Sequence, residues 1–269
     1  MELKVLGPLE ASLDGKSVVP SAGKPRQVLA MLALDAGHVV SVPLLIEELW
    51  GMRPPRSALT TLQTYVMQVR RHIEAALTDG DSRAAKDLLV TRSGGYLLDV
   101  EPAVLDVHNY ERLLAGGARA AELAEYESAS QQLQSALDIW RGRALVDVHT
   151  GPRLSVEAIR MEESRLGALE MRIDVGLRLG RHYLLLSELA MLTASYPMHE
   201  NLCAQFMLAL YRSGQQWRAL EAFKRLRDTL MGELGVDPSA RLQQLHRAIL
   251  RSDPVLDDHH VRSREKLAM

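Results

Sequence analysis

Threonine, glutamine and arginine side chains gather on one face of the segment SALTTLQTYVMQVRRHI, residues 57–73. Apolar residues recur there at helical spacing and predict one buried stripe, made of Leu59, Leu62, Val66, Val69 and Ile73. The opposite face carries Thr60, Thr61, Gln63, Thr64, Gln68, Arg70 and Arg71. Hydroxyl, amide and guanidinium groups can hydrogen-bond base edges, and no acid of the segment repels phosphates. This face predicts contacts with DNA.

Other residues with chemical potential carry weaker signals. Gly15-Lys16-Ser17 resembles the end of a phosphate-binding loop, but Glu10 stands where that motif needs a glycine. His199 and Cys203 lie four residues apart, so a helix would place both on one face, yet two metal ligands are too few. Serine, histidine and aspartate occur in no nucleophile turn. We therefore expect no enzymatic activity, no cofactor and no metal.

Composition limits the class of protein. A chain of 269 residues is long enough for two domains, and 47% hydrophobic with only 4% aromatic residues suits leucine- and alanine-rich helices. The net charge of −2 argues against DNA binding at the level of the whole chain. DNA binding would therefore have to depend on the residues of one local surface. No apolar run could span a membrane, no signal peptide opens the sequence, and the single cysteine suits a reducing compartment. We expect a cytoplasmic protein that has no membrane partner.

The first hundred residues contain the elements that must position the polar face. Asp14-Gly15 predicts a hairpin after short N-terminal strands, and Ser93-Gly94-Gly95 predicts a second hairpin. Three helical patterns lie between them, with Ser41 and Ser57 as expected N-caps of the last two. Strands, three helices and a hairpin form a winged helix-turn-helix, an α+β domain expected at 1–100, whose third helix enters a major groove.

Further candidate contacts flank the third helix. Helix N-termini attract phosphate, and basic side chains slightly outnumber acids from Trp50 to Tyr96. The additional DNA-binding candidates are Lys24, Arg26, Arg56, Ser57, Arg92, Ser93 and Tyr96. The alternatives stay open at this point: a polar helix face can be merely solvated, and a winged helix can dock proteins instead of DNA.

Beyond Val100 the pattern is helical almost throughout. Gly180 and Gly214 are 34 residues apart, as are Leu189 and Phe223, and this is the period of tetratricopeptide repeats. We expect an all-α, tetratricopeptide-like domain at 101–253 and a disordered tail at 254–269. The fold class is therefore mainly α. A repeat scaffold that binds proteins without reading DNA is the alternative function.

Both halves together resemble the Streptomyces antibiotic regulatory protein family. The resemblance rests on LKVLGPLE, GKPRQVLAMLALDAGHVVS, ELWG with the following PP turn, TLQTYVMQVRRHI, SGGYLLDV, SALDIWRG and LYRSGQQWRALEAFKRLRDTLMGELGVDPSARLQQLHRAIL. It implies an OmpR-type winged helix joined to a bacterial transcriptional activation domain. It also implies an activator that binds direct repeats near the −35 element of antibiotic-biosynthesis promoters, as a side-by-side homodimer.

The resemblance further implies that RNA polymerase holoenzyme, including the housekeeping sigma factor, is a partner. In OmpR-like domains the loop before the recognition helix often touches the polymerase. Here that loop is Gly51–Arg56, with Met52 and Arg53 as its prominent side chains. No receiver domain precedes the winged helix, so the sequence does not support control by phosphorelay.

Overall fold

The structure, a computed structural model, describes residues 1–77, 84–101 and 104–257 and contains two compact units. The first unit joins Met1–Ala115 to Gln134–Gly167, and the second joins Gly116–Leu133 to the chain from Ala168 onward. The last strand ends at Leu98 and the helical region begins with α5 at Asp106, and the domain boundary expected between residues 100 and 101 stays a prediction. The division into units differs from it, because residues 134–167 belong to the same unit as the N-terminal part of the chain.

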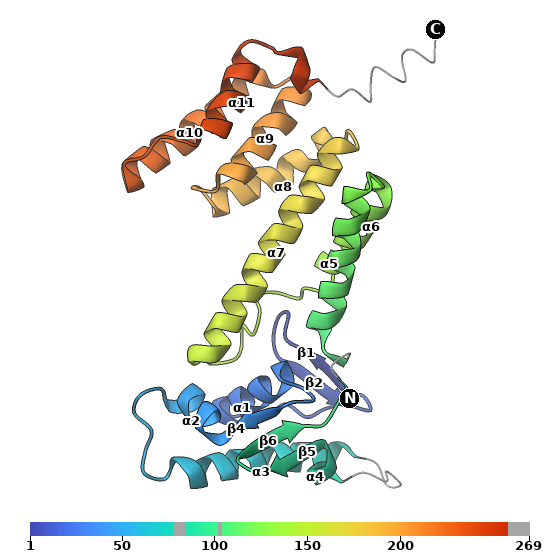
Figure 1. Ribbon diagram of the computed structural model, residues 1–269, viewed down its shortest axis with the longest axis vertical. Helices are drawn as coiled ribbons and strands as arrows, with labels where there is room; N and C mark the ends of the chain where they lie inside the picture. The colour runs from blue at the N-terminus through green and yellow to red at the C-terminus, as the bar shows by residue number, and fades with distance from the viewer. Residues whose placement is uncertain (78–83, 102–103, 258–269) are drawn as a thin grey trace. The chain divides into compact units, whose positions relative to one another are not determined.

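Two three-stranded antiparallel sheets belong to the first unit (Figure 1). The first contains β1 (Glu2–Lys4), β2 (Glu10–Leu13) and β3 (Lys16–Ser17), in that order. Asp14 and Gly15 have φ of 50° and 78°, as the type I′ turn of a two-residue hairpin requires. This confirms the predicted hairpin and places Lys16-Ser17 in a strand rather than in a phosphate-binding loop.

The helices of the winged domain are α1 (Gly23–Leu34), α2 (Val42–Trp50) and α3 (Ala58–Ala76). The second sheet has the order β4 (Val39–Ser41), β6 (Gly95–Leu98), β5 (Leu89–Arg92). The sequence pattern missed β4 and the one-turn helix α4 (Ala85–Leu88), because neither is long enough to show a period. The predicted winged helix-turn-helix is confirmed.

The remaining elements are helical, which confirms the mainly α fold class. They are α5 (Asp106–Glu122), α6 (Tyr126–Leu137), α7 (Pro152–Arg178), α8 (His182–Ser195), α9 (Glu200–Arg212), α10 (Gln216–Leu234) and α11 (Ala240–Leu250). In the second unit α9 packs against both α8 and α10 (Figure 1). These antiparallel helix pairs have the arrangement that the 34-residue period predicts.

One turn recurs at the ends of four helices in the second unit. Ala124, Gly180, Gly214 and Ser252 all have positive φ, of 57°, 74°, 75° and 51°. The next residue donates its backbone N–H to the carbonyl five positions back, for example Arg181 to Gly176 at 2.9 Å and Glu125 to Ala120 at 2.9 Å. This is the Schellman closure of a helix. The repeat therefore extends to two positions without glycine, which the spacing of glycines could not reveal.

Replacing Ala124 by glycine is expected to raise the free energy of unfolding by about 1 kcal/mol, because a Cβ is strained at positive φ. Urea denaturation of the full chain measures the change. Ala121→Gly, three residues earlier in α5, is the matched control and should lower stability by a similar amount. Equal effects of the two substitutions would contradict the assignment of strain to Ala124.

The end of the helical region lies further along than expected. Pro254–Leu256 form a 3₁₀ helix, Leu256 is buried, and its carbonyl accepts a hydrogen bond of 2.8 Å from Arg212 Nε. The expectation of disorder from residue 254 is therefore wrong for 254–257, because one apolar side chain holds this turn. The rest of the expected tail, 258–269, lies outside the described residues. Within the described part of the chain, no helix is both long and apolar enough to cross a membrane.

Candidate nucleic-acid interface

Helix α3 presents a polar face opposite its buried stripe. The stripe consists of Ala58, Leu62, Val66, Val69, Ile73 and Ala76. Leu59, expected in the stripe, is 51% exposed, because Ala58 takes the inward position one residue earlier. The exposed face includes Thr60, Gln63, Thr64, Met67 and Arg71. Thr61 and Gln68 are half-buried at its edges. These five exposed side chains span about three turns of α3 on one face, so they can face one ligand together.

Two threonine hydroxyls of this face, those of Thr61 and Thr64, already donate their protons to neighbouring groups of the same helix end. Thr64 Oγ1 donates to the Thr60 carbonyl at 3.1 Å, and Thr61 Oγ1 donates to Ser57 Oγ at 3.5 Å. The exposed Thr64 side chain therefore offers a methyl group and oxygen lone pairs. A methyl group can contact thymine, and the lone pairs can accept from the amino groups of adenine or cytosine.

Met67 also belongs to this face, although the pattern of polar residues does not indicate it. It lies four residues from both Gln63 and Arg71, and its side chain is 44% exposed. Together with Leu59 it adds apolar surface to an otherwise polar face, and apolar contacts in a major groove select thymine methyl groups. The signal that could have found Met67 is its position opposite Val66 and Val69 on a helical wheel.

The start of α3 is open to solvent. Arg56 and Ser57 are exposed, and Ser57 is the N-cap residue but makes no side-chain cap. The expectation that Ser57 caps this helix is therefore wrong: its backbone φ and ψ of −88° and 12° differ from the extended conformation of a capping serine. By contrast, Ser41 Oγ accepts from the Leu44 N–H, as expected. The helix start keeps amide donors and a positive dipole end available to an anion.

The hairpin of β5 and β6 forms the wing. Arg92 and Ser93 are exposed at its turn, where Gly94 has φ of 77°. A Cβ on Gly95 would lie 2.4 Å from the Val40 carbonyl oxygen, so only glycine fits the close approach of β4. Tyr96, a predicted DNA contact, is only 6% exposed. That prediction is corrected, because β6 is the central strand of its sheet and all four of its residues are buried.

Arg70 has a structural role. Its guanidinium donates to the Leu89 carbonyl at 3.0 and 2.7 Å and to Thr91 Oγ1 at 2.8 Å. These bonds tie α3 to β5, so Arg70 is not available as the free cation that the sequence predicted. Arg71, one residue later, is exposed, so it is the arginine that this helix turn presents to solvent.

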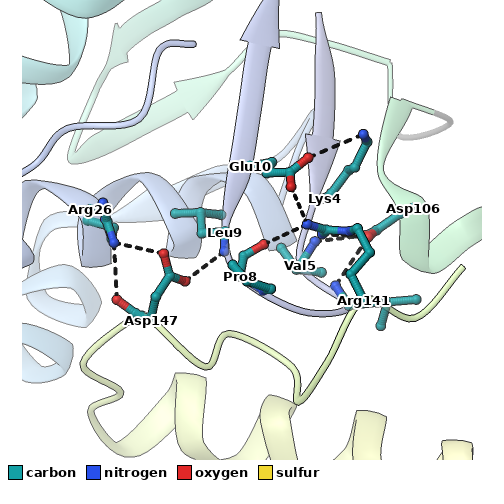
Figure 2. A network of polar contacts seen from close by, with 10 residues as sticks. Lys4, Val5, Pro8, Leu9, Glu10, Arg26, Asp106, Arg141 and Asp147 are labelled. Atoms are coloured by element: carbon teal, nitrogen blue, oxygen red, sulfur yellow. Dashed lines mark hydrogen bonds and ion pairs between the residues drawn. The ribbon is translucent and has the colours of Figure 1, made fainter.

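The two basic residues at the start of α1 also have partners inside the protein. Lys24 Nζ donates to the Leu49 carbonyl and lies 5.3 Å from the centre of the Trp50 ring. Arg26 pairs with Asp147, with 2.7 Å between Nη1 and Oδ2 (Figure 2). Because Asp147 is distant in sequence, neither helical spacing nor local charge could show that Arg26 is neutralised. These contacts correct the prediction that Lys24 and Arg26 clamp phosphates.

Figure 2 shows how the same network holds β2 and the loop before it. Asp147 Oδ1 accepts from the Leu9 N–H at 2.7 Å, and Arg141 pairs with Glu10 at 2.6 Å. The Asp106 carboxylate accepts the Val5 and Leu6 N–H groups at 2.9 and 3.1 Å. Burial raises the pKa of Asp106, while its hydrogen bonds and Arg141 lower it. The contacts come from residues 106–147 and secure the N-terminal sheet.

Glu48 makes a second connection within the first unit. This carboxylate is 3% exposed and accepts the backbone N–H groups of Gly151, Arg153 and Leu154 at 2.6, 2.8 and 3.3 Å. Gln27 Nε2 also donates to it at 3.1 Å. The acceptor therefore caps the N-terminus of α7 from helix α2, a favourable place for a negative charge. Helix α2, which leads into the interface, is fixed by this contact.

The loop Gly51–Arg56 projects between α2 and α3. Met52 is 92% exposed, and Arg53 is exposed beside it. Gly51 ends α2 with φ of 59°, and two prolines follow that cannot continue a helix. The loop therefore displays an apolar side chain and a cation next to the candidate DNA-binding face.

His199 makes contacts inside the protein, and Cys203 is buried. His199 Nδ1 accepts from the Leu202 N–H at 3.4 Å, and Nε2 lies 2.8 Å from Glu170 Oε1. Burial raises the pKa of Cys203 to about 12, so the thiol does not ionise near neutral pH. Among the described residues, no group of three or more possible ligands gathers for a metal.

Comparison with known proteins gives two family matches. Residues 16–98 match the family described as transcriptional regulatory protein, C terminal, and residues 105–250 match the bacterial transcriptional activator domain. The regulatory protein DnrI of Streptomyces peucetius is 60% identical over 96% of this chain and 94% of its own length. The transcriptional regulator RedD of Streptomyces coelicolor is 37% identical over 95% of this chain and 72% of its own.

A solved structure is similar throughout the described fold. Mycobacterium tuberculosis EmbR, in complex with a low-affinity phosphopeptide, superposes with a TM-score of 0.85 at 31% identity. The match covers 94% of this chain but 65% of the EmbR chain. The similarity therefore extends over both the winged helix and the helical repeats.

Proposed function

The chain belongs to the Streptomyces antibiotic regulatory protein family of transcriptional activators, and from this premise we propose how it acts. It binds direct repeats near the −35 element of promoters of antibiotic-biosynthesis genes and recruits RNA polymerase holoenzyme with its housekeeping sigma factor. Two protomers lie side by side, head to tail, since direct repeats lack a two-fold axis. The proposal assigns no catalytic step and no cofactor.

The observation that carries the DNA-binding part is the exposed face of α3 beside an exposed wing. A helix of this kind fits a major groove with its side chains toward base edges, while a wing contacts the backbone. Thr60, Gln63, Thr64 and Met67 are the proposed base readers, with Thr61 and Gln68 at the edges of the face. The proposed phosphate contacts are Arg56, Ser57, Arg71, Arg92 and Ser93.

Affinity for a promoter fragment is expected to fall with salt, with a log–log slope of about −3 for each protomer. The three exposed arginines Arg56, Arg71 and Arg92 set this value, because each phosphate contact contributes roughly −0.9. Fluorescence anisotropy at a series of salt concentrations measures it. Arg92→Ala should reduce the slope by about one unit, whereas Arg26→Ala should leave it unchanged, since Arg26 is paired with Asp147. A flat response to salt would remove the DNA-binding proposal.

Two substitutions on α3 should separate base reading from phosphate binding. Thr64→Ala removes a methyl group and an acceptor, so discrimination between promoter and scrambled DNA should fall by about tenfold, or 1–2 kcal/mol. Arg71→Ala should weaken binding to both DNAs equally. Arg241→Ala, an exposed arginine of α11, is the control for loss of charge alone. If Thr64→Ala lowered the affinity for promoter and scrambled DNA equally, Thr64 would have no part in reading the DNA sequence.

A further inference from the structure

The second unit contains a groove between helices α8 and α10, with α9 as its floor. Its volume is about 370 Å³. The floor and walls are largely apolar and include Cys203, Phe206, Ala222 and Leu226. Ala190 and Ala194 of α8 keep one wall low, because their side chains are small. The groove is therefore wide enough for an apolar side chain and part of an extended peptide backbone, but not for a helix or a DNA duplex.

Two arginines stand on the opposite wall. Arg218 and Arg225 are exposed and lie seven residues apart on α10, which places them on one face about 10 Å apart along the axis. Arg218 contacts the side-chain oxygen of Gln215, three residues earlier. Among the residues that the structure describes, no carboxylate pairs with either arginine, and none lines the groove.

Glu221 and Asp228 lie three or four residues from these arginines on α10, but neither lines the groove and no ion pair joins either of them to Arg218 or Arg225. Two acids of other elements have partners of their own. Glu170 accepts from His199 and Asn201, and Glu200 accepts from the Ser239 N–H at 2.9 Å. The threonine hydroxyls of the groove donate to carbonyls of their own helices, Thr193 to Leu189 at 2.8 Å and Thr229 to Arg225 at 3.0 Å. The two guanidinium groups are thus the positively charged donors of the groove, beside the Tyr196 side chain, and they select a negative ligand.

We propose that this groove binds an extended acidic peptide segment of a partner protein, with carboxylates on Arg218 and Arg225 and one apolar side chain in the hollow over Phe206. Arginine pairs with carboxylates through two parallel hydrogen bonds, which fixes the direction of the peptide. Trp217, the neighbour of Arg218 on α10, is 68% exposed and adds apolar surface to this helix outside the lining of the groove. The apolar floor distinguishes this site from a phosphate-binding surface, which needs charge alone.

The test uses the full chain and a fluorescein-labelled peptide in which aspartate pairs flank one phenylalanine. Anisotropy should show micromolar binding that falls at least tenfold in Arg218→Glu with Arg225→Glu. The matched control, Lys224→Glu with Arg241→Glu, makes the same change in net charge outside the groove and should bind like the original chain. Ala194→Trp fills the hollow and should also abolish binding while both arginines remain.

Several outcomes would overturn the proposal. One is a peptide with lysine in place of aspartate that binds equally well. Others are displacement of the labelled peptide by inorganic phosphate at millimolar concentration or by duplex DNA, and equal loss in the control variant. The groove variants should also keep full affinity for a promoter fragment, since α3 lies outside this unit. Loss of that affinity would assign the arginines to DNA instead.

Discussion

Replacing Glu48 by alanine is expected to lower the free energy of unfolding by about 3–5 kcal/mol. The substitution removes the acceptor of three backbone N–H groups, those of Gly151, Arg153 and Leu154, and leaves these donors without a partner. It also opens a cavity where the side chain was 3% exposed. Urea denaturation of the full chain, followed by circular dichroism, measures the loss.

Glu47→Ala is the matched control, because Glu47 is exposed on the same helix and should change stability by less than about 0.5 kcal/mol. Gly151→Ala should approach the effect of Glu48→Ala, since a Cβ there would lie 2.8 Å from the Glu48 carboxyl carbon. Glu48→Gln keeps the shape of the side chain but turns an amide donor toward N–H groups. Its loss in the free energy of unfolding should therefore fall between those of Glu47→Ala and Glu48→Ala. A Glu48→Ala protein as stable as the control would show that solvent replaces these bonds at no cost.

Replacing both Met52 and Arg53 by alanine is expected to abolish most activated transcription while promoter affinity stays within about threefold, or roughly 0.6 kcal/mol. Met52 is 92% exposed and therefore supports no core, and the loop lies beside α3 rather than on its proposed reading face. An exposed apolar group next to a cation is suited to docking on a protein surface. Transcription by purified polymerase from a dependent promoter, with anisotropy in parallel, measures both quantities.

The control for this pair is Met231→Ala with Arg241→Ala, an exposed methionine and arginine of the second unit. If the loop variant transcribes as well as this control, Gly51–Arg56 is a spacer between two helices. The polymerase contact would then have to be sought on the wing or on the helical repeats. If the variant loses promoter affinity as well, Met52 or Arg53 belongs to the DNA interface.

Regular elements of this fold could be predicted because their signals are local. The stripe of α3, the turn at Asp14-Gly15 and the wing around Gly94 each follow from spacing or from a required positive φ. Leu59 was misplaced because Ala58 also fits the inward position, and a small residue gives a weak hydrophobic signal. Elements of three or four residues, such as β4, show no period at all.

Candidate binding residues were predicted less well than elements, for a different reason. Arg71 was identified from its place opposite the apolar stripe, and Arg92 from its place beside the predicted hairpin turn. Lys24, Arg26 and Arg70 have the same chemical character, but the structure gives each of them an acceptor inside the protein. The acceptor of Arg26 lies 121 residues away, and no local pattern encodes such a partner. A sequence shows which side chains can bind phosphate, but only the fold shows which ones are free.

The discontinuous first unit also sets an order of events during synthesis. Residues 1–100 leave the ribosome well before Asp147 and Gly151, the partners of Arg26 and Glu48. Until then Glu48 has Gln27 as a donor but lacks the three backbone N–H groups at the start of α7, of which Gly151 is 103 residues away, and the N-terminal sheet lacks the support of Arg141. The nascent winged helix therefore remains incompletely stabilised until residues 141–154 have been translated. A chain that ends before Arg141 lacks all of these contacts, so its winged helix should be less stable than that of the full chain and more readily cut by proteases.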